Sequence, residues 1–270
     1  MKGQRIRPAA PLAATCARLM YLTLTLALLA RLPLAINASP TVAAYTVGPN
    51  NADFPTLPAA WAVLVAQQTD AILRLANGVH PIPPDSVTLL DASSATRPFT
   101  ISHVPVAPAV GGGGVGGVLI SPGQPTQPQE YLGASSLVTL SGPVVLAFSN
   151  ITFAGFACVD RTFNSPWAVV ALYGTSQLVL TDVTIRDNGA INAVFALAAQ
   201  DSAFVTLERV AMVADSAHSI EFLSMGSAAI SVFDSRIEGV SAWRDTVFDA
   251  YNAAAVTVVR TVFTRTLFNL

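Results

Sequence analysis

Lysine is almost absent from this sequence. Among 270 residues, fourteen are lysine or arginine, Lys2 is the one lysine, and charged residues make up 11% of the chain. Proteins that bind nucleic acid or anionic lipid depend on clustered basic side chains. The composition therefore argues against nucleic acid and anionic lipid as partners. It also provides little electrostatic steering toward an anionic polysaccharide.

Cysteine and histidine are scarce as well. The two cysteines are Cys16 and Cys158, and the three histidines are His80, His103 and His218. Cys16 lies in a segment that we expect to be removed, so the mature chain has no partner for an intramolecular disulfide. We expect Cys158 to be a small buried hydrophobic residue rather than a reactive thiol. The histidines lack the spacing of metal ligands, so we expect no metal.

The sequence also lacks a nucleotide-binding motif. The glycine-rich run over 111–117 lacks the Gly-Lys-Ser/Thr ending of a phosphate-binding loop. We therefore expect no nucleotide and no cofactor. With the prolines that flank it, the run is typical of a flexible excursion from regular structure, which we place at 104–130.

The first 44 residues have the order of an export signal. Basic residues precede an apolar run over 19–30, and small residues follow, with cleavage expected after Ala38 or Ala44. The apolar run has twelve residues before Arg31, which is shorter than the roughly 20 that a membrane-spanning helix needs. A retained single-pass anchor is the alternative. An organelle transit peptide is another, because no acidic residue precedes Asp53.

Removal of this leader makes the protein acidic. Lys2 and four arginines leave with residues 1–44, so nine basic residues face sixteen acidic ones and the formal net charge becomes −7. We expect the mature domain to span 45–270 and to be secreted, in an extracellular space or a cell wall. A membrane is a partner only if the leader is retained.

Five copies of an eight-residue pattern organise the second half of the chain. They begin at residues 146, 178, 205, 230 and 256, so the steps are 32, 27, 25 and 26 residues. A period in this range indicates a solenoid. Positions one, three and eight are apolar in every copy. Position five is polar in every copy: Asn150, Asp182, Arg209, Asp234 and Arg260.

Each copy predicts two short strands that meet at a polar corner. Apolar residues at positions one and three follow the two-residue period of a strand. No Asn-Gly or Asp-Gly pair follows, as a tight hairpin would need. The two strands therefore fit two sides of one coil of a parallel β-helix. Leucine-rich horseshoes and helical repeats are disfavoured, because the LxxLxL signature is absent and Val, Ile, Thr and Phe dominate.

Stacked coils place equivalent residues next to each other, and we expect position three to form an inward column of Leu180, Leu207, Val232 and Val258. A third apolar run precedes each of the last four copies, over 169–172, 193–197, 220–223 and 246–248. Three strands per coil suit a right-handed β-helix of the pectin-lyase type. Earlier, irregular coils are expected over 86–145. The fold class is therefore an all-β, right-handed parallel β-helix.

The solenoid begins with a capping helix. A strand over 45–47 is followed by a helix that Pro58 opens, with Trp61 and Leu64 at helical spacing. A further strand over 71–76 ends at Asn77-Gly78. The helix would cover the apolar end of the first coil, as solenoids require. The strand over 45–47, the stretch from Asp53-Phe-Pro-Thr to Ala60, and residues 72–82 with Asn77-Gly-Val-His80 resemble the start of pectinesterases and related pectin-lyase-like β-helices.

The resemblance implies three candidate catalytic positions. Asn192, which begins Asn-Ala-Val-Phe-Ala-Leu, corresponds to the glutamine of the family's QAVAL strand, an oxyanion donor. Asp215 corresponds to the acid and Asp249 (or Asp245) to the nucleophile. This sequence departs from the family at each: asparagine replaces glutamine, and the motifs around both aspartates differ. The family's LGRPW arginine has no counterpart.

Other enzymes of the fold match no better. The mature chain lacks the lysine base of the lyases, its acids are dispersed, and Ala217-His218-Ser219 lacks the paired aspartates of polygalacturonases. We therefore expect a non-catalytic module that presents a long strand surface to a glycan or to a cell-surface protein. The alternative is a divergent or truncated carbohydrate esterase or lyase that acts on a pectin-like polysaccharide.

Two further expectations concern a modification and the far end. Asn150-Ile-Thr152 is a glycosylation sequon. Its asparagine equally suits a corner residue whose side chain bonds to backbone. The last copy closes at Phe263, and the residues after it are too few to cap a coil. A continuation of the chain is expected there, with end-to-end self-association or a capping partner as alternatives.

Overall fold

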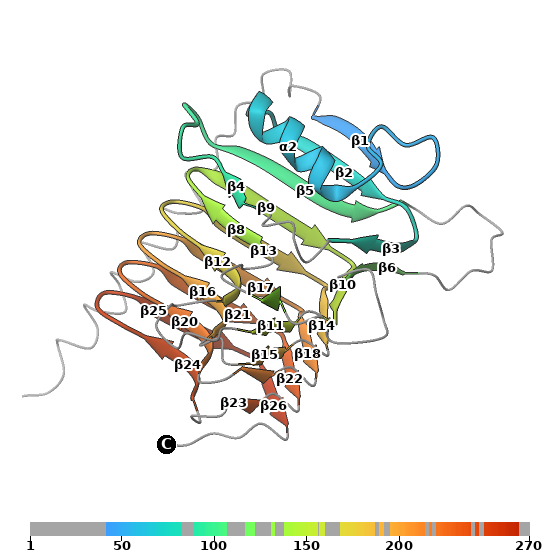
Figure 1. Ribbon diagram of the computed structural model, residues 1–270. Coiled ribbons are helices and arrows are strands. Elements are labelled where there is room, and N and C mark those ends of the chain that lie inside the picture. Colours follow the sequence, from blue (N-terminus) through green and yellow to red (C-terminus); the bar gives the residue numbers. More distant parts are fainter. Residues whose placement is uncertain are drawn as a thin grey trace, which may run out of the picture. The chain divides into compact units, whose positions relative to one another are not determined.

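The computed structural model describes thirteen stretches of the chain: 42–82, 89–106, 117–121, 131–132, 138–155, 157–159, 168–186, 189–191, 195–213, 216–217, 220–238, 241–242 and 246–264. They lie in the compact unit Val42–Leu270. Parallel strands stack coil upon coil, which makes the chain a right-handed parallel β-helix, as predicted (Figure 1). The predicted leader lies outside the described residues except for residues 42–44.

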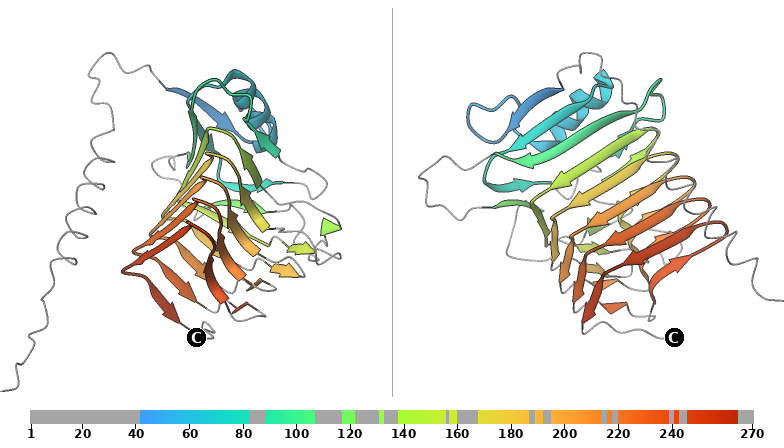
Figure 2. Two further views of the ribbon diagram at one scale, coloured as in Figure 1. Left: turned by 90° about the vertical axis from the view of Figure 1, so that its left-hand side faces the viewer. Right: turned by 180° about the vertical axis from the view of Figure 1, so that it is seen from behind.

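The largest sheet, which we call sheet A, has eight parallel strands and contains the first half of every repeat copy. Its strands lie side by side in chain order (Figure 2, right). They are β1 (Ala43–Val47), β2 (Ala71–Leu75), β5 (Phe99–Pro105), β9 (Val144–Ser149), β13 (Gln177–Thr181), β17 (Phe204–Glu208), β21 (Ala229–Phe233) and β25 (Ala255–Val259).

Sheet B contains the second half of each copy, as the pattern predicts. Its strands are β3 (Gly78–Pro81), β6 (Val118–Ser121), β10 (Ile151–Ala154), β14 (Thr184–Arg186), β18 (Ala211–Val213), β22 (Arg236–Glu238) and β26 (Val262–Thr264). Strand β6 interrupts the predicted excursion over 104–130, and β5 overlaps its start.

The predicted third strand of each coil is confirmed, and these strands form sheet C. It consists of β4 (Leu89–Asp91), β8 (Val138–Ser141), β12 (Ala168–Leu172), β16 (Phe195–Ala199), β20 (Ile220–Ser224) and β24 (Thr246–Ala250).

A fourth sheet corrects the expectation of three strands per coil. Sheet D has five strands of two or three residues: β7 (Tyr131–Leu132), β11 (Ala157–Val159), β15 (Gly189–Ile191), β19 (Ser216–Ala217) and β23 (Ser241–Ala242). Strands this short contain no full alternation of apolar and polar residues, so the periodicity does not detect them.

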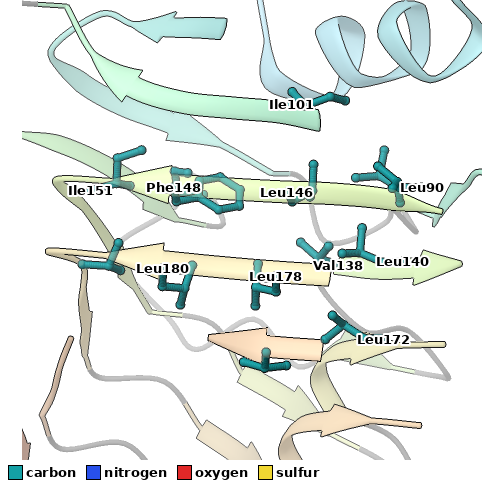
Figure 3. Close-up of a cluster of buried hydrophobic side chains, with 14 of the residues drawn as sticks. Leu90, Ile101, Val138, Leu140, Leu146, Phe148, Ile151, Leu172, Leu178 and Leu180 are labelled. Atoms are coloured by element: carbon teal, nitrogen blue, oxygen red, sulfur yellow. The ribbon is translucent and has the colours of Figure 1, made fainter. Parts of the chain in front are cut away.

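The core is a set of inward columns, and the predicted register is confirmed. Leu180 pairs with Leu207, Leu207 with Val232, and Val232 with Val258. The first three are buried, with 3%, 1% and 0% of their surface exposed. Figure 3 shows Leu178 and Leu180 on the same side of their strand, one strand away from Leu146 and Phe148. Val258 also takes its predicted place in the column but is 39% exposed, because no described strand covers β25.

The predicted capping helix is present as α2 (Leu57–Gln67), which lies at the end of the stack where the chain enters it (Figure 1). The Thr56 hydroxyl accepts a hydrogen bond from the Ala59 amide, and Pro58 occupies the first turn, where its missing amide is harmless. Leu57, Trp61 and Leu64 are buried against the first coils. At eleven residues, this helix falls well short of what crossing a membrane requires, and no other helix occurs in the described part of the chain.

Candidate functional site

The outer face of sheet A is a broad surface with little charge. Side chains that alternate with the core residues point outward, and register aligns them in columns. Arg74 and Glu208 are the only charged residues among the outward-facing positions of the eight described strands. The central column consists of small, apolar and hydroxyl side chains: Ser102, Ala147, Val179, Thr206, Ser231 and Thr257.

An aromatic side chain stands out on this face. Phe204 begins β17 and is 46% exposed, although large apolar residues usually lose water contact on folding. Its register neighbours are Gln177 on β13, which is exposed, and Ala229 on β21. The small methyl of Ala229 leaves that side of the ring open, while the Gln177 amide offers hydrogen-bond donors and an acceptor beside it.

A second aromatic residue lies across the hydroxyl column. Phe233 ends β21, is half-buried, and pairs in register with Glu208. It lies four residues along the strand from Ala229, which corresponds to roughly 13 Å at 3.3 Å per residue. Thr206 and Ser231 lie between the two rings. The arrangement can offer flat apolar contacts at two points and hydroxyl groups between them.

The polar corners predicted from position five are real, and their backbone explains them. Asn150, Asp182, Arg209, Asp234 and Arg260 all have positive φ, between 49° and 57°. Such left-handed residues turn the chain from sheet A to sheet B. The first four of these corners also bond to the next coil through their backbone amides. The Asp182 amide donates to the Glu208 carbonyl at 3.0 Å, and the Asp234 amide donates to the Val259 carbonyl at 3.0 Å.

Charges alternate along this corner and pair between coils. The Arg209 guanidinium donates to both Asp182 oxygens at 2.6 and 2.9 Å, and Arg260 binds both oxygens of Asp234, at 2.7 Å through Nη2. These hydrogen bonds lower the pKa of Asp182 and of Asp234. They raise the pKa of both arginines. The pairs are exposed and mutually neutralising, as is typical of a structural salt-bridge ladder at a protein surface.

The three weak catalytic candidates are not assembled by the described structure. Asn192 and Asp215 lie outside the described residues. The backbone of Asp249 belongs to β24 and pairs with Leu223 of β20. His218 also lies outside the described residues. The enzymatic interpretation therefore gains no geometric support from the part of the chain that is described.

The two described histidines have structural roles. His103 is fully buried, accepts a hydrogen bond from Trp61 Nε1 at 2.8 Å through Nε2, and places Nδ1 2.8 Å from the Ala147 carbonyl. Its ring stacks on Phe148 at 4.0 Å between centroids. Burial lowers the pKa of His103 to about 3, so the ring is neutral and Nδ1 carries the proton. His80 contacts the Ala76 carbonyl at 2.7 Å. No metal-ligand cluster occurs among the described side chains.

Asn150 is exposed, as a glycosylation acceptor must be. The residue is also a left-handed corner with φ of 57°, and its amide donates to the Thr181 carbonyl at 3.2 Å. The alternative, a side chain bonded to backbone, has no counterpart among the hydrogen bonds of the described residues. The corner is made by backbone conformation, which leaves the Asn150 side-chain amide directed at solvent and compatible with modification.

A second set of corners was missed by the sequence analysis. Gly174, Asp201, Gly226 and Asn252 each precede a repeat copy by four residues, and all have positive φ, between 60° and 73°. They turn the chain from sheet C to sheet A. The recurrence of Gly, Asp or Asn at this fixed offset was the signal that could have revealed them, because these residues tolerate the left-handed region best.

No family model and no curated protein matches the sequence. Two solved structures of the pectin methylesterase from Aspergillus niger are similar in structure, one deglycosylated and one that keeps an N-acetylglucosamine stub. They are 10% and 11% identical, the alignments cover 84% of this chain and 87% of theirs, and the TM-score is 0.34 in both cases.

Proposed function

We propose that this protein is an exported, non-catalytic β-helix of the pectin-lyase-like fold that binds a glycan through the outer face of sheet A. The proposal rests on Phe204, an aromatic side chain that is 46% exposed on a face with few charged residues. A glycan is preferred to a cell-surface protein because the ring is flanked by an amide and hydroxyl groups rather than by a contiguous apolar patch.

The chemistry of the face suits a sugar chain. One face of a pyranose ring carries C–H groups, which are attracted to the negative face of an aromatic ring. The ring hydroxyls need donors and acceptors, which Gln177, Thr206 and Ser231 can supply. Because the face carries little charge, an uncharged polysaccharide, or a polyuronide with esterified carboxyl groups, fits better than a free polyuronate.

Binding to a panel of polysaccharides tests the proposal. Affinity electrophoresis in gels that contain xylan, methyl-esterified pectin or polygalacturonate should show retardation by the first or second and little by the third. The Phe204→Ala protein should bind at least about tenfold more weakly, a loss of about 1.4 kcal/mol or more. The Val63→Ala protein is the matched control, since Val63 is 39% exposed on helix α2, away from the face. Equal binding by both variants would contradict the assignment of the face.

The rival function predicts turnover. A divergent esterase would release methanol from methyl-esterified pectin, and a lyase would release unsaturated ends from a polyuronide. We expect neither. Release of methanol that Asp215→Ala or Asp249→Ala abolishes would establish an esterase. Retention of an immobilised protein partner without any polysaccharide binding would instead favour the protein-binding role.

Export rests on the leader. We propose cleavage after Ala38 in preference to Ala44, because β1 begins at Ala43 and cleavage after Ala44 would remove two residues that pair with Ala71 and Ile72. The intact mass of secreted protein checks this, and glycosidase treatment of the same sample checks Asn150. Mature protein that keeps residues 1–38 in a membrane fraction would support the single-pass anchor instead.

A further inference from the structure

The two outer edges of sheet A are in different states. At the β1 edge, the Thr46 amide donates to Asp53 Oδ2 at 2.7 Å, and the Thr46 carbonyl accepts from the Phe54 amide at 3.1 Å. The amide and the carbonyl of one strand residue point to the same side, so these bonds occupy the outer edge of β1 at Thr46, near the end of the strand. Helix α2 covers the apolar interior behind it. Nothing further can pair here without displacing these groups.

The β25 edge is open as far as the described strands show. The Ala255 amide donates to the Ala228 carbonyl, and the Val259 carbonyl accepts from the Asp234 amide, both at 3.0 Å. Alternate residues of β25 therefore bond toward the stack. Val256 and Val258 direct their amides and carbonyls the other way, and no described strand pairs with that side.

The same two residues end the core columns. Val256 and Val258 continue the columns of Ile230 and Val232, which are fully buried, yet Val256 is half-buried and Val258 is 39% exposed. On β26, Phe263 continues the inward column of Ile237, which is 1% exposed, and Phe263 itself is only partly buried. Backbone groups that no described strand pairs and incompletely buried core side chains thus occur together at one end of the stack, where β25 and β26 are the last described strands (Figure 1).

We propose that a second copy of this chain covers this end, tail to tail, by antiparallel pairing of the two β25 strands about a two-fold axis at Thr257. This register places Val256 opposite Val258 of the partner subunit. Their backbones would exchange hydrogen bonds, because these are the residues whose amides and carbonyls face the edge. Their side chains would meet on the inner side, so the two cores become continuous and neither open edge remains.

The occupied β1 edge decides between the two ways of stacking copies. A head-to-tail contact would need that edge, where Asp53 and Phe54 already bind and α2 covers the core. It would also leave one edge free and grow without limit. The tail-to-tail contact uses only the open edge and closes after two copies.

A cysteine crosslink tests the axis directly. Directly opposite residues of a non-hydrogen-bonded antiparallel pair have Cα atoms about 4.5 Å apart, within the range of about 4.4–6.8 Å that a disulfide spans. Oxidation of the full-length Thr257→Cys protein should therefore give a dimer whose peptides join position 257 to itself by mass spectrometry. Thr206→Cys is the matched control, because it lies in the same outward column two strands inside the stack. Equal crosslinking of the two variants would overturn the proposal.

Light scattering after size exclusion tests the assembly without a crosslink. The full chain should have the mass of a dimer, and Val258→Pro should shift it to a monomer, with an apparent Kd at least about tenfold higher. Proline is tolerated on an edge strand where the amide points outward, and circular dichroism verifies that the variant keeps its strands. A wild-type monomer at micromolar concentration, as expected if another part of this chain covers the edge, or open-ended growth into filaments would each overturn the proposal.

Discussion

The first and last coils of this β-helix face the same physical problem and differ in how they meet it. At the first coil, α2 places Trp61 and Leu64 over the apolar interior, and at most 1% of the surface of either residue is exposed. At the last described coil, Val258 remains 39% exposed and Val256 is only half-buried. A solenoid buries its core only where each coil has a neighbour. Equivalent apolar residues therefore contribute differently to stability, depending on their place in the stack.

The strongest way to sharpen this comparison is to place a charge in the same column at two depths. Leu207→Asp should unfold the solenoid, because an unpaired carboxylate buried at 1% exposure costs several kcal/mol. Val258→Asp, in the same column at the open end, should change the stability of a single subunit by no more than about 1 kcal/mol, measured at protein concentrations below the Kd of the proposed dimer. Urea unfolding followed by circular dichroism checks both. A soluble, folded Leu207→Asp protein would refute the register.

Removal of the closure at the first coil should have the next largest effect. Trp61→Ala should cost about 3–5 kcal/mol, since it opens a cavity and leaves His103 Nε2 without its buried donor. Trp61→Phe keeps most of the volume and loses the hydrogen bond, so it should cost less. If Trp61→Ala unfolds at the same urea concentration as wild type, α2 does not cap the core.

Acidic pH should destabilise the same end of the stack, where α2 covers the first coil. Burial lowers the pKa of His103 from its ordinary value of 6.5 to about 3. Above pH 6.5 both the folded and the unfolded chain carry a neutral ring, so the stability is complete. Between pH 6.5 and about 3 only the unfolded chain binds the proton, so stability from this group falls by roughly 1.4 kcal/mol per pH unit. Denaturation curves across this range should show the decline, and a His103→Leu protein should lack this component.

Substitutions at the corners between sheets A and B should have the smallest effect on stability. This effect should not depend on how either end of the stack is covered. Asn150 has φ of 57°, where a β-branched residue costs about 1–2 kcal/mol. Asn150→Val should therefore destabilise by that amount, while Asn150→Gly should be close to neutral. Asn150→Asp keeps the corner and removes the sequon, so a mass change in secreted Asn150→Asp protein separates glycosylation from folding.

The sequence alone determined the coil and its first corner. The period of the five copies, their alternation and the recurring polar residue were sufficient to place sheets A and B and to align Leu180 with Leu207 and Val232. These features are local and periodic, because each coil repeats the same two strands. The capping helix could likewise be predicted from the sequence, since Pro58 and the spacing of Trp61 and Leu64 are local signals of a helix.

Only the tertiary structure decided the rest. The strands of sheet D are too short to leave a period. The contact between Trp61 and His103 joins residues 42 positions apart. The different exposures of Val232 and Val258, at 0% and 39%, come from apolar residues of one type at one repeat position. Burial depends on what lies on the next coil, and at the edges of sheet A that is determined by which backbone groups already have a partner.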